Sequence, residues 1–264
     1  MTQSAIPSKV ISLLGGVNVL ICRPEESAQA LAMALSALGA KCYTLPTLNI
    51  LELPISEREK HCILSLDHYQ YVIVTSQHAA NIGLAHIDRY WPQFPTKQTW
   101  LAIGLKTASL LREENLQLIS PDKDLTSEEI LKLPQLQKIK DQKVLILKGK
   151  EGRDLLPQIL SKRGAKVDSI ELYERKCPIY TDKEINAALI EFQANYIVAL
   201  SGETLLNLIS LCAEHNIDLS SKTFIVPSQR VANIAYEHNF KSVLIPANLK
   251  PIDLIKSITN HKKS

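Results

Sequence analysis

An internal repeat at a constant offset of 125 residues constrains this chain more than any other feature. Residues 19–45 align with residues 144–170 without a gap, and ten of these 27 positions are identical. The same offset places residues 71–76 over residues 196–201, and both segments are apolar runs that end in serine. A repeat of this length is a whole structural unit. Since 264 residues exceed the usual size of one domain, we expect two similar domains.

Each repeat begins with a short apolar run, which is followed by a stretch with helical periodicity. The apolar face of the first helix carries Ala28, Leu31, Ala32, Leu35 and Leu38. Further strands are predicted near residues 71–75, 100–103, 116–119, 195–200, 222–226 and 241–245. Alternating strands and helices predict parallel sheets that are covered by helices through right-handed crossovers.

Local signals mark where several helices begin and where the chain is irregular. A hydroxyl residue followed three positions later by glutamate is a capping box, which satisfies free backbone donors at a helix start. The pairs are Ser56 with Glu59, Thr126 with Glu129, and Thr181 with Glu184. The segment 87–100, which contains Pro92 and Pro95, is the clearest predicted loop.

Composition excludes several classes of function. Thirty Lys and Arg against 27 Asp and Glu give a net charge of +3, so we expect no nucleic-acid partner. The apolar stretch 10–22 is shorter than the roughly 20 residues of a membrane span, so we expect no membrane partner. Five widely spaced cysteines without a C-x-x-C pair indicate reduced thiols and a cytoplasmic protein. They are Cys22, Cys42, Cys62, Cys177 and Cys212.

The candidate site consists of the residues that follow the predicted strands. Ligands of open parallel sheets bind beyond the carboxyl ends of the strands, where helix N-termini offer free N–H groups. Hydroxyls, glycines and cations dominate these turns, and they suit a bound anion. The candidates are Arg23, Thr75, Ser76, Gly104, Lys106, Thr107, Lys148, Gly149, Gly152, Arg153, Ser201, Ser228 and Arg230.

Each candidate also has a purely structural explanation. The serines and threonines stand where helix N-caps are expected, and the cations can be solvated strand ends or partners of a neighbouring acid. Donors at six turns together favour an anion-binding cleft over six separate coincidences. No metalloprotease, nucleophile-elbow or P-loop motif occurs, which leaves a nucleotide-dependent transferase without support. A non-enzymatic two-lobed protein that closes on a small anion stays open as the alternative.

Six segments resemble, in order, motifs of the uroporphyrinogen-III synthase family. They are VLICRPEE, YVIVTSQHAA, AIGLKTASLL, VLILKGKEGRDLL, RGAKVDSIELYER and YIVALSGE, and they cover most of residues 17–245. One segment departs from the family pattern, because residues 226–231 read VPSQRV where I-G-x-x-T-A is common. Ser228 and Arg230 are then expected to replace the missing glycine and threonine contacts.

The resemblance implies two similar doubly wound, flavodoxin-like parallel-sheet domains with a substrate cleft between them. A two-stranded extended linker would join them, with connectors near residues 43–50 and 168–177. Domain 1 would comprise residues 1–45 and 175–264, and domain 2 residues 46–174. Repeat boundaries therefore need not be domain boundaries.

The resemblance also implies an enzyme, a cyclising hydro-lyase of tetrapyrrole biosynthesis. Its substrate would be hydroxymethylbilane, a linear tetrapyrrole with eight carboxylates, which loses water and closes to uroporphyrinogen III with ring D inverted. The route would pass through an azafulvene and a spiro intermediate. No cofactor and no metal are implied. We expect a monomer that makes transient contact with hydroxymethylbilane synthase.

Tyr173 is the residue that the resemblance assigns to catalysis. A phenol, with a pKa of about 10, stays protonated at neutral pH and can donate a hydrogen bond to the leaving hydroxide. The alternative is a strand aromatic that only packs.

Overall fold

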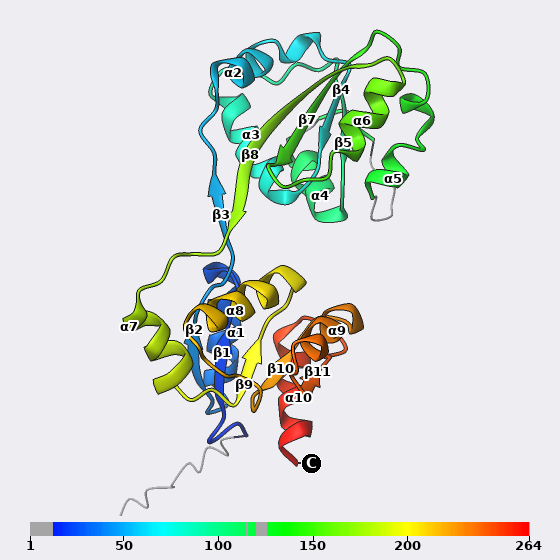
Figure 1. Ribbon diagram of the computed structural model, residues 1–264. Helices are drawn as coiled ribbons and strands as arrows, with labels where there is room; N and C mark the ends of the chain where they lie inside the picture. The colour runs from blue at the N-terminus through cyan, green and yellow to red at the C-terminus, as the bar shows by residue number, and fades with distance from the viewer. Residues whose placement is uncertain (1–12, 115, 120–125, 264) are drawn as a thin grey trace, which may run out of the picture. The chain divides into compact units, whose positions relative to one another are not determined.

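The computed structural model describes residues 13–114, 116–119 and 126–263. The chain divides into two compact units, each built around its own sheet (Figure 1). Unit 1 comprises residues 1–49 and 176–264, and unit 2 comprises residues 50–175. The predicted fold class, α/β with parallel sheets in two domains, is confirmed.

Unit 1 contains a five-stranded parallel sheet with the order β11-β10-β9-β1-β2. Numbered along the unit, this is the flavodoxin-like order 2-1-3-4-5. Its strands are β1 Asn18–Ile21, β2 Lys41–Thr44, β9 Tyr196–Val198, β10 Thr223–Ile225 and β11 Ser242–Leu244. Its helices are α1 Glu25–Ser36, α7 Asp182–Ile185, which continues as a π-helix over Asn186–Glu191, α8 Gly202–Glu214, α9 Gln229–Glu237 and α10 Pro251–Lys263.

Unit 2 contains a six-stranded sheet with the order β3-β8-β7-β4-β5-β6. Strand β3 runs beside β8 in the opposite direction (Figure 1), whereas the pairs from β8 to β6 are parallel. The strands are β3 Asn49–Glu52, β4 Tyr71–Val74, β5 Thr99–Ala102, β6 Leu118–Ile119, β7 Lys143–Gly149 and β8 Lys166–Lys176. The α-helices are α2 Glu57–Leu64, α3 Gln77–Asp88, α4 Leu105–Glu113, α5 Ser127–Ile130 and α6 Leu155–Lys162, and 3-10 turns lie at Leu66–His68 and Pro134–Leu136.

Each of the two units is built from half of the first repeat and half of the second. Unit 1 combines β1 and β2 of the first repeat with β9 to β11 of the second, and unit 2 combines β4 to β6 of the first with β7 and β8 of the second. The strand register follows the offset of 125. Val19 pairs with Tyr196 in unit 1, and their counterparts Val144 and Tyr71 pair in unit 2. Repeat boundaries are therefore not the boundaries of the folded units.

The central strands are apolar because both of their faces are buried. Along β1, Leu20 belongs to one core of unit 1, whereas Val19 and Ile21 belong to the core on the opposite face. This alternation is the period-2 geometry of a strand. Helix α1 buries its predicted face at Ala28, Leu31 and Leu35, and it ends at Ser36, before Leu38.

The capping predictions are confirmed, and the predicted loop is shorter than expected. All three capping boxes are present, at the starts of α2, α5 and α7. The loop prediction of residues 87–100 was wrong at both ends, because α3 continues through Asp88 and β5 begins at Thr99. Burial of Ile87 and Trp100 in the same core explains why these ends are regular.

The predicted second connector, residues 168–177, is mostly a sheet strand. Strand β8 pairs with β7 from Lys166 to Tyr173, and its buried Ile170 and Leu172 explain this pairing.

All five cysteines are free, and Cys22, Cys62 and Cys212 are buried. Among the described residues, no helix has both the length and the hydropathy needed to cross a bilayer.

Candidate functional site

Unit 2 contains a pocket of about 350 Å³ at the carboxyl ends of β4 and β7. Seven of the sequence-predicted site residues line it, from three separate segments of the chain. They are Thr75, Ser76, Lys148, Gly149, Gly152, Arg153 and Tyr173. The sheet order makes β4, β7 and β8 neighbours, which explains why segments about 75 and 100 residues apart in the sequence meet here.

Tyr173 lies at the wall of this pocket with its hydroxyl hydrogen-bonded to Ser76. The two oxygens are 2.9 Å apart, and the tyrosine is only 3% exposed. Ser76 is also the N-cap of α3 and accepts a hydrogen bond from the Ala79 N–H at 3.1 Å. The His78 ring contacts the Tyr173 ring edge-on, with 5.6 Å between centroids. Two residues at the start of α3 thus hold the phenol in one place.

Gly149 is needed because the Tyr173 ring packs directly against its backbone. A Cβ atom at Gly149 would lie 2.6 Å from Tyr173 Cζ, far inside contact distance. The strand register shifts at this point, since Lys148 pairs with Glu171 but Gly149 pairs with Tyr173. Such a bulge re-aims side chains at the end of a strand. The absence of a side chain at Gly149 therefore makes room for a tyrosine of the protein itself.

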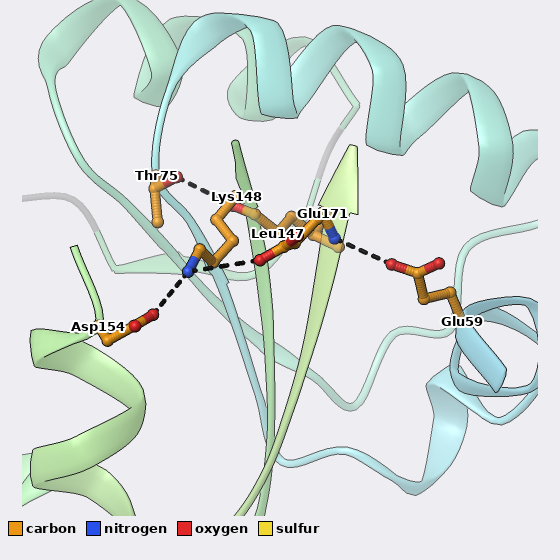
Figure 2. Close-up of polar contacts among 6 residues, drawn as sticks. All are labelled: Glu59, Thr75, Leu147, Lys148, Asp154 and Glu171. Carbon is orange, nitrogen blue, oxygen red and sulfur yellow. Dashed lines mark hydrogen bonds and ion pairs between the residues drawn. The ribbon is translucent and has the colours of Figure 1, made fainter. Parts of the chain in front are cut away.

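Lys148 is buried and already paired. Lys148 is 4% exposed, and its Nζ lies 2.8 Å from Asp154 Oδ1 and 3.9 Å from Glu171 Oε1 (Figure 2). The backbone N–H of Glu171 donates in turn to Glu59 Oε1 at 3.1 Å. Burial raises the pKa of Glu59, but hydrogen bonds from Ser56 and Glu171 outweigh it and hold this pKa below its ordinary value.

Arg153 and Thr75 also have partners within unit 2. Arg153 Nη1 lies 2.9 Å from Glu128 Oε1, and the arginine side chain is 77% exposed, so the pair is weak and can open. The pKa of Glu128 is lowered by a hydrogen bond from its own backbone N–H and also by the Thr126 hydroxyl and the Arg153 charge. Thr75 donates its hydroxyl proton to the Leu147 carbonyl at 3.1 Å, which leaves its oxygen as an acceptor.

The predicted residues Gly104, Lys106 and Thr107 are not among those that line this pocket. Gly104 precedes α4 with a φ of 84°, a left-handed conformation that favours glycine. Lys106 is exposed, whereas Thr107 is 2% exposed and faces the core. The backbone conformation of this turn explains the glycine at position 104, and burial explains the threonine at position 107.

The remaining candidates belong to unit 1 and lie at the carboxyl ends of three adjacent strands. Arg23 follows β1, Ser201 follows β9 and Ser228 follows β10. Ser201 caps α8 through the Thr204 N–H at 3.0 Å, as the capping explanation predicted. Ser228 precedes α9 without a side-chain capping bond to any described residue. Burial lowers the pKa of the Arg23 guanidinium from its ordinary value.

Arg230 lies at the N-terminus of α8. Its Nη1 is 3.4 Å from the position of a Cβ on Gly202, the first residue of that helix. A guanidinium beside the positive end of a helix is not stabilised by the helix dipole. The Arg230 guanidinium and the N-terminus of α8 are both electropositive and together suit an anion, so a role of Arg230 in substrate binding stays a prediction.

Sequence reasoning missed the carboxylates around the pocket. Glu128 and Glu151 line it, while Asp154 and Glu171 flank Lys148. Arg175 also lines the pocket. The sequence did indicate acids beside the predicted cations, because the segment KGKEGRD mixes cations with acids. Glu171 also precedes Tyr173 by only two residues. Which acid meets which cation depends on the turn geometry.

The fold and these turns define a class of protein, a two-unit α/β protein with hydrogen-bond donors at the carboxyl ends of parallel strands in both sheets. The profile of uroporphyrinogen-III synthase HemD matches residues 29–256. The chain belongs to the uroporphyrinogen-III synthase family.

Individual relatives agree with this assignment. The uroporphyrinogen-III synthase of Salmonella typhimurium is 30% identical over 249 residues, covering 92% of this chain and 100% of the relative. The enzyme of the same name from Escherichia coli is 29% identical over 251 residues, with the same coverage. A mutant uroporphyrinogen III synthase from Thermus thermophilus has the same fold, with a TM-score of 0.62 at 15% identity, covering 94% of this chain and 98% of that one.

Proposed function

We propose that this chain closes hydroxymethylbilane to uroporphyrinogen III with loss of water and inversion of ring D. Membership of the uroporphyrinogen-III synthase family supports the activity. The observation that carries the mechanism is the hydrogen bond between Ser76 and Tyr173 at the wall of the unit 2 pocket.

In this proposal, Tyr173 donates its proton toward the leaving hydroxyl. Ser76 Oγ accepts the Ala79 N–H, and its own proton can point at the phenol oxygen 2.9 Å away. The Tyr173 O–H is then free to donate to the substrate. A hydrogen bond in this direction also stabilises the phenol oxygen as negative charge develops on it. Tyr173 is therefore our catalytic residue, and Ser76 orients it.

The substrate chemistry needs positioning more than strong acids or bases. The hydroxyl leaves with the bonding electrons and departs as water, while the ring nitrogen gives up its proton, which yields an azafulvene. The azafulvene carbon bonds to the already substituted α-carbon of ring D and forms a spiro intermediate. That intermediate opens by breaking the bond between ring D and its old bridge carbon, and this carbon then bonds to the free α-carbon, which inverts ring D. The α-carbon loses its proton as the pyrrole is restored, and a ring nitrogen regains a proton. Holding one conformer is a positional task.

The carboxylates of the substrate would be held by cations and by backbone N–H groups. In unit 2 we assign this role to Arg153, whose exposed pair with Glu128 can exchange partners. In unit 1 we assign it to Arg23, with Arg230 at the N-terminus of α8.

We assign the protein to the cytoplasm, as a monomer that receives its substrate from hydroxymethylbilane synthase. Sedimentation of the protein alone tests its monomeric state, and sedimentation with the synthase tests the contact between the two proteins.

The direct test supplies hydroxymethylbilane enzymatically from porphobilinogen, oxidises the products and separates the porphyrin isomers. The protein should yield mainly isomer III. Mainly isomer I, the product of spontaneous closure, would overturn the proposal.

Replacement of Tyr173 by phenylalanine tests the catalytic role. We expect Tyr173→Phe to lower kcat by about one to two orders of magnitude with the fold retained, because it removes the proton donor. Tyr71→Phe is the matched control, since its hydroxyl donates to the Gln135 carbonyl at 3.3 Å and Tyr71 is not among the pocket-lining residues. A Tyr173→Phe variant with the kcat of the control would remove Tyr173 from the mechanism.

A further inference from the structure

Lys148 is the only lysine or arginine that is buried among the described residues. A buried ammonium group is stable only when it is paired and hydrogen-bonded. Asp154 supplies that partner at 2.8 Å, and Glu171 adds a second carboxylate at 3.9 Å (Figure 2). Both acids remain partly exposed, with side chains 66% and 44% accessible. The lysine therefore faces two carboxylates of its own chain, and a substrate carboxylate would have to displace one of them.

The aliphatic part of Lys148 lies against the turn that follows β7. Its Cε atom is 3.3 Å from the position of a Cβ on Gly152, and the Gly152 N–H donates to the Gly149 carbonyl at 3.0 Å. Asp154 stands at the far end of this turn, directly before α6. The ion pair therefore closes the turn of residues 149–154 over the lysine side chain.

The same turn is tied to the catalytic tyrosine. The Lys150 N–H donates to the Tyr173 carbonyl at 2.8 Å, and Gly149 lies directly against the Tyr173 ring. A shift of the turn must therefore shift the phenol, since no space separates them. A continuous set of contacts runs from Asp154 through Lys148 and the turn to Tyr173 and Ser76.

We propose that Asp154 is a positioning residue, which acts through Lys148 to hold the 149–154 turn in the shape that places Tyr173. On this proposal Lys148 is part of the same device and does not bind a substrate carboxylate. The inference rests on the proposed function for its kinetic effect, but not for its structural effect on the turn.

The test compares Asp154→Asn, Lys148→Met and the double variant. Asp154→Asn keeps the size of the side chain and removes its charge. We expect kcat to fall about tenfold with KM nearly unchanged, since small misplacement of a reacting group has costs of this order. Because both residues act as one unit, the double variant should lose no more kcat than the worse single variant. Asp67→Asn, which removes an exposed carboxylate elsewhere in unit 2, is the matched control and should keep its kcat.

Amide hydrogen exchange of residues 149–154 provides a readout that needs no turnover. It should be faster in Asp154→Asn and Lys148→Met than in the unsubstituted chain, and unchanged in Asp67→Asn. If Asp154→Asn does not fold, Asp154→Glu, which keeps the charge, should retain most of the kcat. A loss of about tenfold in the kcat of the folded glutamate variant would then count against the proposal.

The outcomes separate the two proposals. If the unsubstituted chain forms only isomer I, the proposed function fails, and the exchange rates alone decide the inference. Unchanged exchange and unchanged kcat in Asp154→Asn would overturn the positioning role. A higher KM with normal kcat in Lys148→Met, with a further increase in the double variant, would show that Lys148 binds substrate and would also overturn it.

Discussion

Adding one methyl group at Gly149 should disable the site through Tyr173. In Gly149→Ala, the new Cβ would lie 2.6 Å from Tyr173 Cζ, 2.8 Å from Cε2 and 3.0 Å from the hydroxyl oxygen. Carbon atoms pack at about 3.5–4.0 Å, so the ring must retreat by about 1 Å. Tyr173 is 3% exposed and contacts His78, which leaves little room for this retreat.

The displacement has two consequences of calculable size. A hydrogen bond of 2.9 Å to Ser76 that lengthens by about 1 Å is no longer a hydrogen bond. Overpacking costs about 1–3 kcal/mol and the lost hydrogen bond about 1 kcal/mol, against a gain of about 0.4–1 kcal/mol from a stiffer unfolded chain. We expect a net loss of about 2 kcal/mol in unfolding free energy. We expect kcat to fall up to about 100-fold, as for comparable misplacement in other enzymes.

Urea unfolding and the coupled isomer assay measure these two effects. Gly83→Ala is the matched control, because its Cβ would lie 2.8 Å from Leu147 Cδ1 but would meet only the ends of flexible side chains. This control should change stability while kcat stays near that of the unsubstituted chain. In the Gly149→Ala background, Tyr173→Phe should cause no further loss of kcat. A normal kcat in Gly149→Ala would refute the idea that contact with Gly149 positions the phenol.

Two further predictions concern stability. The pKa of Glu59 is lowered in the folded state, so its contribution is present above its unfolded pKa and is lost as pH falls through the folded value. Unfolding free energy measured by urea should therefore fall below pH 4.5 less steeply in Glu59→Gln; equal slopes would contradict this. Thr181→Ala removes the hydroxyl that caps α7 through the Glu184 N–H at 3.3 Å, and it should cost about 1 kcal/mol, read as a lower Tm. An unchanged Tm would show that this cap is dispensable.

The elements of the fold were largely predictable because their signals are local. Strand β1 is recognisable from its apolar run, and the capping box of Ser56 with Glu59 marks the start of α2. The loop prediction failed at Ile87, which lies in α3, and it overlapped the strand that was rightly predicted from residue 100; burial of Ile87 and Trp100 in a common core extends regular structure beyond what the nearby prolines suggest. A loop signal acts over a few residues, whereas burial depends on neighbours that are distant in the sequence.

The candidate site was predictable as a set of residue types but not as a set of partners. Ser76 and Tyr173 both follow from position and resemblance, yet the bond between them depends on β4 and β8 flanking β7 in the sheet. Lys148 was predicted to bind substrate, and its burial with Asp154 gives it a different task in our proposal. An ion pair across a turn depends on turn geometry, which charge order alone does not specify.

The sequence by itself determined the repeat, the alternation of strands and helices, and the donor-rich turns, because periodicity and turn chemistry are written in neighbouring residues. The family resemblance implied domains that cut across the repeats, but periodicity and turn chemistry do not show this; in the tertiary structure each unit takes half of each repeat, with Val19 beside Tyr196 and Tyr71 beside Val144. The halves are equivalent in pattern, so hydrophobic periodicity cannot choose between pairing within a repeat and pairing across repeats. That choice is made by strand pairing between distant segments, and it also brings Ser76, Gly149 and Tyr173 into contact.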